Sequence, residues 1–213
     1  MGQNLTVHLD ETTATKAKVL AARRSTSVSK LVAGQIERLV AEEDVYEHAQ
    51  QTALAQLERG FHLGGGPMPR CMTDERVSVD TNILVYSYDA DAGSKHETAN
   101  SVLADLWRSR TGTLSAQVLQ EFYVTVTRKL PEPLARRVAR EIIGTYQAWS
   151  LHRPGVDEVI AASELEERHR LSFWDALVVV SAQRLNARTL LTEDLQNGRR
   201  FGDLVAVNPF GPS

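Results

Sequence analysis

The chain has 213 residues and a mass of 23.6 kDa, enough for one large domain or two small ones. Hydrophobic residues make up 42% and charged residues 24%, which argues against wholesale disorder, and the net charge of −3 argues against general polyanion binding. The longest apolar stretch covers only residues 176–180, no signal peptide is visible, and Cys71 is the single cysteine. We therefore expect a protein of the reducing cytoplasm without a membrane span, an internal disulfide or a thiolate metal cluster.

Charge and composition divide the chain. Residues 1–30 carry a net charge of +3, against −6 for the rest, which suggests separate roles. Residues 64–69, with the sequence GGGPMP, cannot continue a helix and are typical of a linker. Whether the joining of the flanking parts is natural or engineered is not decided by the residues. The predicted parts are a first domain at 1–44, a helix, tail and linker at 45–71, and a larger domain at 72–213.

The N-terminal part begins with strict alternation of apolar and polar residues over 4–10, which predicts one short strand. No second strand follows nearby, so the partner must come from elsewhere, most simply from a second copy. A helix then runs to about Arg24 with Asp10 or Thr12 as its N-cap, and a second helix begins after Ser27. Its apolar residues have helical spacing: Val28, Leu31, Val32, Ile36, Leu39 and Val40.

This order over about residues 3–44 resembles the ribbon-helix-helix repressors. The resemblance implies an intertwined dimer whose two-stranded ribbon enters the major groove of operator DNA. The polar face of the strand would meet base edges, and the start of the second helix would bind a phosphate. The alternative is that this part serves dimerisation only. The implied DNA-binding residues are Asn4, Thr6, His8, Ser27 and Ser29.

Residues 45–59 are predicted to form a third helix, which Gly60 ends. Phe61 and Leu63 follow in a glycine-flanked segment that has no core of its own to enter. We interpret this extended tail as a docking segment with two anchors for a partner surface. The alternative is a tether in which these two side chains are incidental.

From Arg76 onward, short strands alternate with helices. This alternation predicts an α/β fold with a parallel sheet flanked by helices, in which ligands bind beyond the carboxyl ends of the strands. The predicted strands lie at 77–79, 113–116, 150–153, 189–192 and 204–208, and the predicted helices at 95–110, 117–129, 132–148, 156–170 and 173–187.

Four carboxylates fall where a free charge is costly or needs a partner. Asp80 and Asp194 each follow a predicted strand, Glu121 borders the buried stripe of its helix, and Asp175 opens an almost wholly apolar helix. Three of them have simpler interpretations, in which Asp175 forms a capping box with Ser172, Asp194 caps a turn, and Glu121 pairs at the surface with a basic residue. That basic residue would be Arg128 or Lys129, while Asp89, Asp91 and Glu193 are interpreted as solvated charges.

Carboxylates that share one pocket repel each other, and a divalent cation removes that repulsion. All-oxygen ligands without a nearby cysteine favour Mg²⁺ or Mn²⁺. Such ions polarise a phosphodiester and lower the pKa of a bound water for in-line attack.

Four segments in this order resemble the PIN-domain ribonucleases, in particular the bacterial VapC toxins: VSVDTNILVY, QVLQEFYVTVTRK, LSFWDALVVVSA and LLTEDLQNGRRF. The similarity covers about residues 76–210 and implies a divalent-metal-dependent endoribonuclease with an RNA substrate. It implies catalytic and metal-binding roles for Asp80, Glu121, Asp175 and Asp194, supported by Thr81, Asn82 and Thr192.

The N-terminal part with its tail is similar to a VapB antitoxin, so the whole chain resembles a type II toxin–antitoxin pair joined in one homo-oligomeric polypeptide. This resemblance implies that the tail covers the toxin groove, in cis or in trans. Arg59, or secondly Arg70, would pair with the acids and compete with metal, unless both are ordinary solvated charges. Since tethering gives an effective concentration in the millimolar range, we expect the intact chain to be nearly inactive as a nuclease.

Two other hypotheses remain open at this stage. One is a DNA-binding regulator whose acidic pocket only binds a metal, and the other is a structural protein with a decayed active site. The residues do not determine the RNA target, the operator sequence, the number and identity of the metals, or the oligomer order above a dimer.

Overall fold

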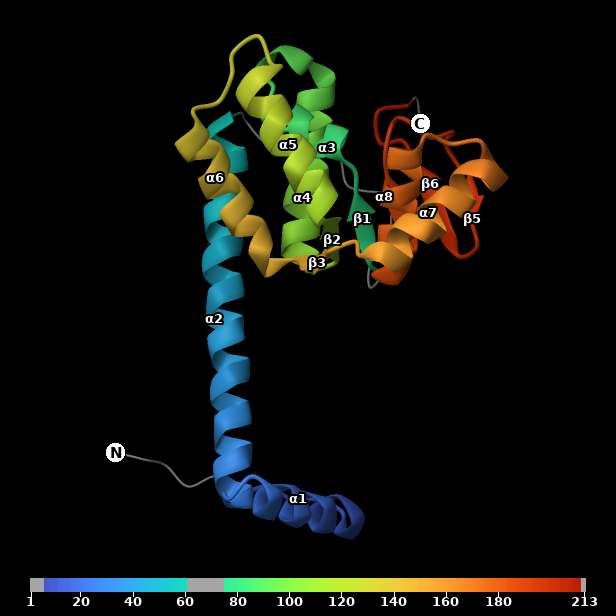
Figure 1. The fold of residues 1–213 in the computed structure, drawn as a ribbon. Helices are drawn as coiled ribbons and strands as arrows, with labels where there is room; N and C mark the ends of the chain where they lie inside the picture. The colour runs from blue at the N-terminus through green and yellow to red at the C-terminus, as the bar shows by residue number, and fades with distance from the viewer. Residues whose placement is uncertain (1–5, 61–74, 212–213) are drawn as a thin grey trace. The chain divides into compact units, whose positions relative to one another are not determined.

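The structure is a computed structural model that describes residues 6–60 and 75–211, with side chains of the first segment up to Glu58 (Figure 1). The chain divides into two compact units, Met1–Glu47 and His48–Ser213, and the long helix α2 (Val28–Gly60) contributes to both. None of the helices in the described segments combines the length and hydropathy that a membrane span requires. Several predicted residues lie outside the described side chains: Asn4, Arg59, Phe61, Leu63 and Arg70.

In the first unit, both helices begin as predicted. Asp10 caps α1 (Glu11–Arg23) by accepting a hydrogen bond from the Thr13 N–H at 2.9 Å, and the Ser27 hydroxyl accepts one from the Lys30 N–H at 3.2 Å. The described part of the predicted strand, residues 6–10, is not in a strand, since a strand needs a pairing partner that one chain does not supply here.

The third helix predicted at residues 45–59 is not a separate element. Instead α2 runs without a break from Val28 to Gly60, because residues 41–59 contain neither glycine nor proline to end it. The helix reaches Gly60, the last residue of this described segment, so its predicted end there stays a prediction.

The second unit contains a mostly parallel sheet flanked by helices, which confirms the predicted α/β class (Figure 1). Within the described residues the strand order is β3-β2-β1-β4-β6-β5, and only β5 runs antiparallel. Val77, Ser78 and Val79 of β1 pair with Thr189, Leu190 and Leu191 of β4. The strands are β1 (Val77–Val79), β2 (Gly112–Ser115), β3 (Ser150–His152), β4 (Thr189–Leu191), β5 (Arg200–Phe201) and β6 (Leu204–Val207).

The helices of this unit follow the predicted order with two differences. Helix α3 follows β1 directly and was not predicted, and α6 begins at Arg136 rather than 132, because Pro131 and Pro133 disfavour helical backbone in the residues before them. The helices are α3 (Thr81–Tyr86), α4 (Ser94–Ser109), α5 (Ala116–Arg128), α6 (Arg136–Thr145), α7 (Val156–His169) and α8 (Phe173–Arg184), with 3-10 turns η2 (Ala90–Ala92) and η3 (Tyr146–Ala148).

A buried aromatic cluster closes one end of the core. The rings of Trp107, Tyr146 and Trp149 lie with centroids 5.1–5.5 Å apart, and each residue is at most 5% exposed. Gly112, the first residue of β2, lies beneath this cluster: a Cβ atom there would come within 2.4 Å of the Trp149 ring. Only glycine therefore fits this position without displacing the indole.

Replacement of Gly112 by alanine is expected to lower the free energy of unfolding by about 1–3 kcal/mol, because the added methyl group overpacks the Trp149 ring. Urea denaturation of the full chain measures this. The matched control is Gly144→Ala in α6, where a Cβ meets nothing within 4 Å and the helix should gain about 0.5–1 kcal/mol. Equal stability of the two variants would contradict the packing argument.

Candidate active site

The sheet order brings two polar segments together. After β3 the chain returns to place β4 beside β1, and at such a switch point the carboxyl ends of neighbouring strands open a crevice. Asp80 follows β1, while Thr192 and Asp194 follow β4. The Asp80 N–H donates to the Leu191 carbonyl at 2.9 Å, which continues the strand pairing up to this point.

Asp80 is the buried centre of this group, with 7% of its surface exposed. Its carboxylate accepts hydrogen bonds from the Thr81 N–H and the Thr192 hydroxyl, both at 2.6 Å. Burial raises the pKa of Asp80 to about 6; these hydrogen bonds oppose the rise, and the charges of Asp194 and Glu121 add to it. The charged form of Asp80 is therefore costly in the absence of a cation.

Two threonines connect Asp80 to two of the other acids. The Thr81 hydroxyl donates to the Glu121 carboxylate at 2.9 Å, while the Thr81 N–H is bound to Asp80. The fully buried Thr192 hydroxyl donates to Asp80 and accepts from the Asp194 N–H at 3.2 Å. Thr81 therefore links Asp80 to Glu121 through its N–H and its hydroxyl, and the Thr192 hydroxyl links Asp80 to the backbone of Asp194.

Glu121 on α5 faces this site and not the surface, so the structure does not support the surface salt bridge. Its second carboxylate oxygen accepts from the Gln117 side-chain amide at 2.9 Å, and the same amide donates to the Trp174 carbonyl at 3.3 Å. Gln117 thereby links Glu121 to the first turn of α8, where Asp175 lies next to Trp174.

Asp175 and Asp194 complete the group. The Ser172 hydroxyl caps α8 by accepting from the Asp175 N–H at 3.1 Å, as the capping interpretation predicts, but the Asp175 charge also acts on Asp194. The Asp194 carboxylate accepts from the Asn82 side-chain amide at 3.1 Å. Burial raises the pKa of Asp194, the charges of Asp175 and Glu193 raise it further, and Asn82 and Lys95 oppose the rise.

The four acids share one edge of the sheet, but they do not form a ready-made metal cage. Among residues 6–60 and 75–211, no group of three or more His, Cys, Asp or Glu side chains lies close enough to hold an ion. Coordination of one ion by these four acids therefore stays a prediction. The donors are all oxygen, and the Asn82 side-chain oxygen is buried without a partner, so the chemistry fits a hard divalent cation.

The family model for the PIN domain matches residues 77–200, more than half of the chain. The chain belongs to the PIN domain family. Two solved structures are similar to the chain at low identity, and no curated protein matches it. One is a VapC toxin of Mycobacterium tuberculosis that cleaves the sarcin–ricin loop, with 23% identity, a TM-score of 0.44, and 54% of this chain and 86% of that one covered. The other is a VapBC complex of Rickettsia felis bound to a promoter DNA fragment, with 20% identity, a TM-score of 0.44, and coverage of 61% and 96%.

Two parts of the PIN domain site were not foreseen. Gln117 gave no signal in the sequence, because a single glutamine four residues before Glu121 is unremarkable on a helix. Glu193, interpreted above as a solvated charge, instead accepts a hydrogen bond from the Tyr86 hydroxyl and pairs with Lys95 at 2.5 Å. This interpretation was wrong because the partners come from α3 and α4, far away in the sequence.

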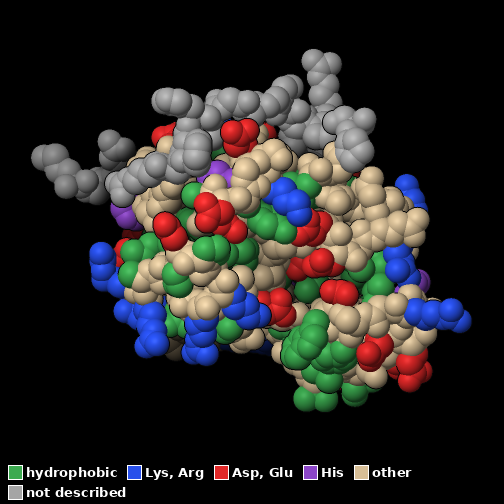
Figure 2. All heavy atoms as spheres, turned by 90° about the horizontal axis from the view of Figure 1, so that it is seen from above, with side chains coloured by type: hydrophobic (Ala, Val, Ile, Leu, Met, Phe, Trp, Pro, Cys, Tyr) green, Lys and Arg blue, Asp and Glu red, His purple; other side chains and the backbone are tan. Residues whose placement is uncertain are grey.

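Figure 2 views the PIN domain from above, the side on which β1 leads into α3 (Figure 1). Asp and Glu side chains gather toward the middle of this face, whereas Lys and Arg side chains lie mainly nearer its edges. An incoming phosphate therefore meets negative charge at the site unless a cation is present.

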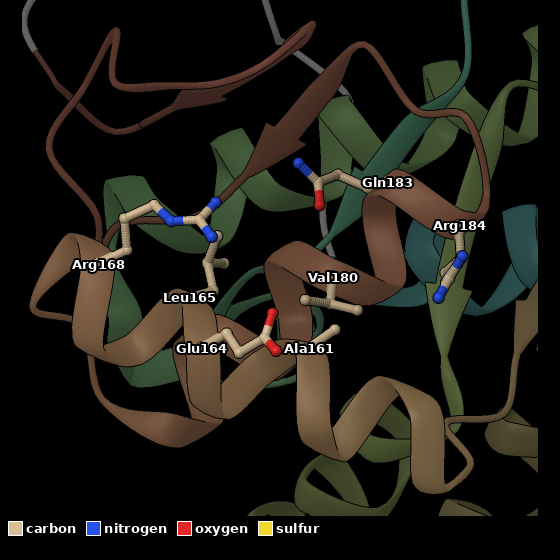
Figure 3. Close-up of a pocket in the computed structure, with 7 residues that line it drawn as sticks. All are labelled: Ala161, Glu164, Leu165, Arg168, Val180, Gln183 and Arg184. Carbon is tan, nitrogen blue, oxygen red and sulfur yellow. The ribbon is translucent and has the colours of Figure 1, made fainter.

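A cavity of about 290 Å³ between α7 and α8 is separate from the acids (Figure 3). Its α8 residues lie in the second half of that helix, away from Asp175. None of the predicted site residues lines it. The lining residues are Ala161, Glu164, Leu165, Arg168, Val180, Gln183 and Arg184.

The raised pKa of Asp80 predicts a pH-dependent stability. Because the pKa of about 6 in the folded chain exceeds the ordinary 3.8, the stability linked to this group is present below pH 4 and is lost as the pH rises through 6. We therefore compare the free energy of unfolding of Asp80→Asn with that of the parent, both with a chelator present. The difference in favour of Asp80→Asn should be larger at pH 8 than at pH 4, by roughly 1–3 kcal/mol.

Urea denaturation at both pH values measures this difference. Asp91→Asn, at an exposed position, is the control and should show no such change. An Asp80→Asn effect that is the same at pH 4 and pH 8 would contradict the assignment of the shift to Asp80.

Proposed function

We propose that the chain is a type II toxin–antitoxin system in one polypeptide. Its PIN domain acts as a divalent-metal-dependent endoribonuclease, and its N-terminal part acts as a DNA-binding, autorepressing antitoxin that inhibits it. The observation that carries the nuclease is that Asp80 and Asp194, which follow β1 and β4, are linked by short hydrogen-bond paths to each other and to Glu121 on α5, while the charge of Asp175 on α8 acts on Asp194. Acids crowded in this way favour a bound cation, and divalent metals are typical of PIN domains.

In this proposal Asp80, Glu121, Asp175 and Asp194 hold Mg²⁺ or Mn²⁺. The ion would supply charge neutralisation at the phosphodiester and acidify water for in-line attack. Thr81, Thr192 and Asn82 orient the carboxylates to which they already donate hydrogen bonds. Such outer partners fix the direction of a ligand and its basicity.

RNA is proposed as the substrate because the four sequence segments resemble PIN-domain ribonucleases, which act on RNA. A phosphodiester is also what hard cations held by carboxylates activate. The location proposed for this reaction is the cytoplasm.

The nuclease proposal predicts Mg²⁺-dependent RNA cleavage by the chain that begins at Met72. Asp80→Asn and Glu121→Gln should each lower the rate at least about 100-fold, since each removes a carboxylate charge that holds the cation in this proposal. Asp91→Asn is the matched control and should cleave like the parent, because Asp91 is exposed on η2.

The alternative function is a regulator whose acidic pocket only binds a metal, and it predicts a different effect of Asp80→Asn in cells. Under that function Asp80→Asn would leave the biological effect intact, whereas a nuclease would lose its toxicity. RNA cleavage that persists in both acid variants would refute the nuclease proposal.

Inhibition by the fused antitoxin is supported by the second half of α2. Ala53 and Leu57 are each only 2% exposed, Ala49 is 9% exposed, and the Gln50 side-chain amide donates to the Trp107 carbonyl of α4 at 2.6 Å. This face of α2 therefore docks on the unit that holds the PIN domain. We propose that the docked helix delivers the inhibitory tail, with Arg59 first and Arg70 second as the residues that compete with metal.

Weakening this docking should activate the nuclease. Ala53→Glu places a charge in a buried position, so helix residues 48–57 should detach and RNA cleavage by the full chain should rise about tenfold or more. Ala55→Glu, the same change at an exposed position of the same helix, should leave the intact chain inhibited.

Gln50→Ala, which only removes the hydrogen bond to Trp107, gives a milder second test in case Ala53→Glu unfolds the chain. Circular dichroism reports folding of each variant. Full activity of the unmodified chain would contradict inhibition in the fusion.

The first unit supports a second copy as its partner. Among its described residues only Ala21 is a buried hydrophobic, while large apolar side chains of both helices stay exposed. A second copy would cover them, complete a two-stranded ribbon, and present Asn4, Thr6 and His8 to operator DNA, with Ser27 and Ser29 at a phosphate. The exposed side chains include Val19, Leu20, Ile36, Leu39 and Val40.

A further inference from the structure

An exposed tryptophan lies directly beside the acidic site. Trp174 is the second residue of α8, it is 60% exposed, and Asp175 follows it in the chain. The other tryptophans, Trp107 and Trp149, are 0% and 5% exposed. An indole that is mostly exposed to solvent contributes little to the packing of the core, so the Trp174 side chain is available to contact another molecule.

The position of Trp174 is fixed relative to the acids. Its carbonyl accepts from the Gln117 amide at 3.3 Å, and that amide also donates to Glu121 at 2.9 Å. Gln117 is 5% exposed, and its side-chain oxygen is buried without a hydrogen-bond partner, which is energetically unfavourable. The two hydrogen bonds that its amide group donates, to Trp174 and to Glu121, offset this cost. The Trp174 ring meets the Phe173 ring edge to face, with centroids 5.4 Å apart.

We propose that the Trp174 indole is a stacking platform for a nucleobase of single-stranded RNA next to the cleaved phosphate, with Phe173 packed against its ring. This inference rests on the proposed nuclease function and specifies how its substrate binds. The acids repel phosphates, so affinity at this edge requires an uncharged contact, and base–aromatic stacking is such a contact. In a duplex the base faces are covered, so the platform selects loops and single strands.

The test is a titration of the full chain with a non-cleavable 2′-O-methyl RNA oligonucleotide in Mg²⁺, in the parent and in the Ala53→Glu chain. Because the other two tryptophans are buried, stacking should quench fluorescence from Trp174 alone, and the quench should vanish in Trp174→Phe and Trp174→Leu. Trp174→Leu, which lacks an aromatic face, should bind roughly ten- to hundredfold more weakly, while Trp174→Phe should retain most of the affinity. The same oligonucleotide in a duplex should not quench.

The outcomes separate the two levels of the proposal. Equal RNA affinity of the Ala53→Glu chain with and without Trp174→Leu overturns the stacking platform but leaves the nuclease in place. Unchanged RNA binding together with altered sedimentation of Trp174→Leu assigns the indole to a protein contact and also overturns it. An Ala53→Glu chain that is folded by circular dichroism but neither binds this oligonucleotide nor cleaves the unmodified RNA contradicts the nuclease function itself.

Discussion

The buried Asp80 carboxylate constrains the rest of the acidic site. It lies at the carboxyl end of β1, where burial and nearby negative charges both destabilise its ionised form. Two hydrogen-bond donors partly oppose this destabilisation. The Thr192 hydroxyl and the Thr81 N–H reduce this cost by donating hydrogen bonds to the Asp80 carboxylate, and the Thr81 hydroxyl connects the same segment to Glu121. A divalent cation would reduce it further, because it would offset the charges of Asp194 and Glu121 that act on Asp80.

The sheet topology makes this arrangement possible. The residues of the site come from distant parts of the chain. Asp80 and Thr192, for example, are 112 positions apart and come together because β4 lies next to β1 in the sheet. Helices α5 and α8 then add Glu121 and Asp175, and Gln117 fixes the distance between these two helices at the level of the site. The site residues lie at strand ends and on helices, so the geometry of the site depends on a few hydrogen bonds at the sheet edge.

The sequence predicted five of the six described strands to within a residue or two at each end, and it predicted the edge at which the acids lie. The two-residue strand β5 was missed because so short a segment carries no alternating pattern. The sequence could not predict α3, since a six-residue helix leaves almost no periodic pattern and its N-cap is the same Asp80 that serves the site. Glu193 was misinterpreted for a different reason: its partner Lys95 is 98 positions away, and only tertiary structure reveals the pair. The continuity of α2 was missed because the resemblance to ribbon-helix-helix repressors ends near residue 44 and residues 45–59 were interpreted as a separate helix, although no helix-breaking residue separates them.

The continuous α2 helix also bears on how a fused inhibitor could work. Its second half is docked through Ala53, Leu57 and the Gln50 hydrogen bond, and the same helix begins in the proposed DNA-binding unit. A separate antitoxin is released by dilution or degradation, but a tethered one rebinds at an effective concentration near the millimolar range. In the proposed scheme, activation therefore requires that the docked helix be pulled away, unfolded or cut from the PIN domain. Binding of the first unit to another molecule can contribute only if it changes the docking equilibrium of this helix.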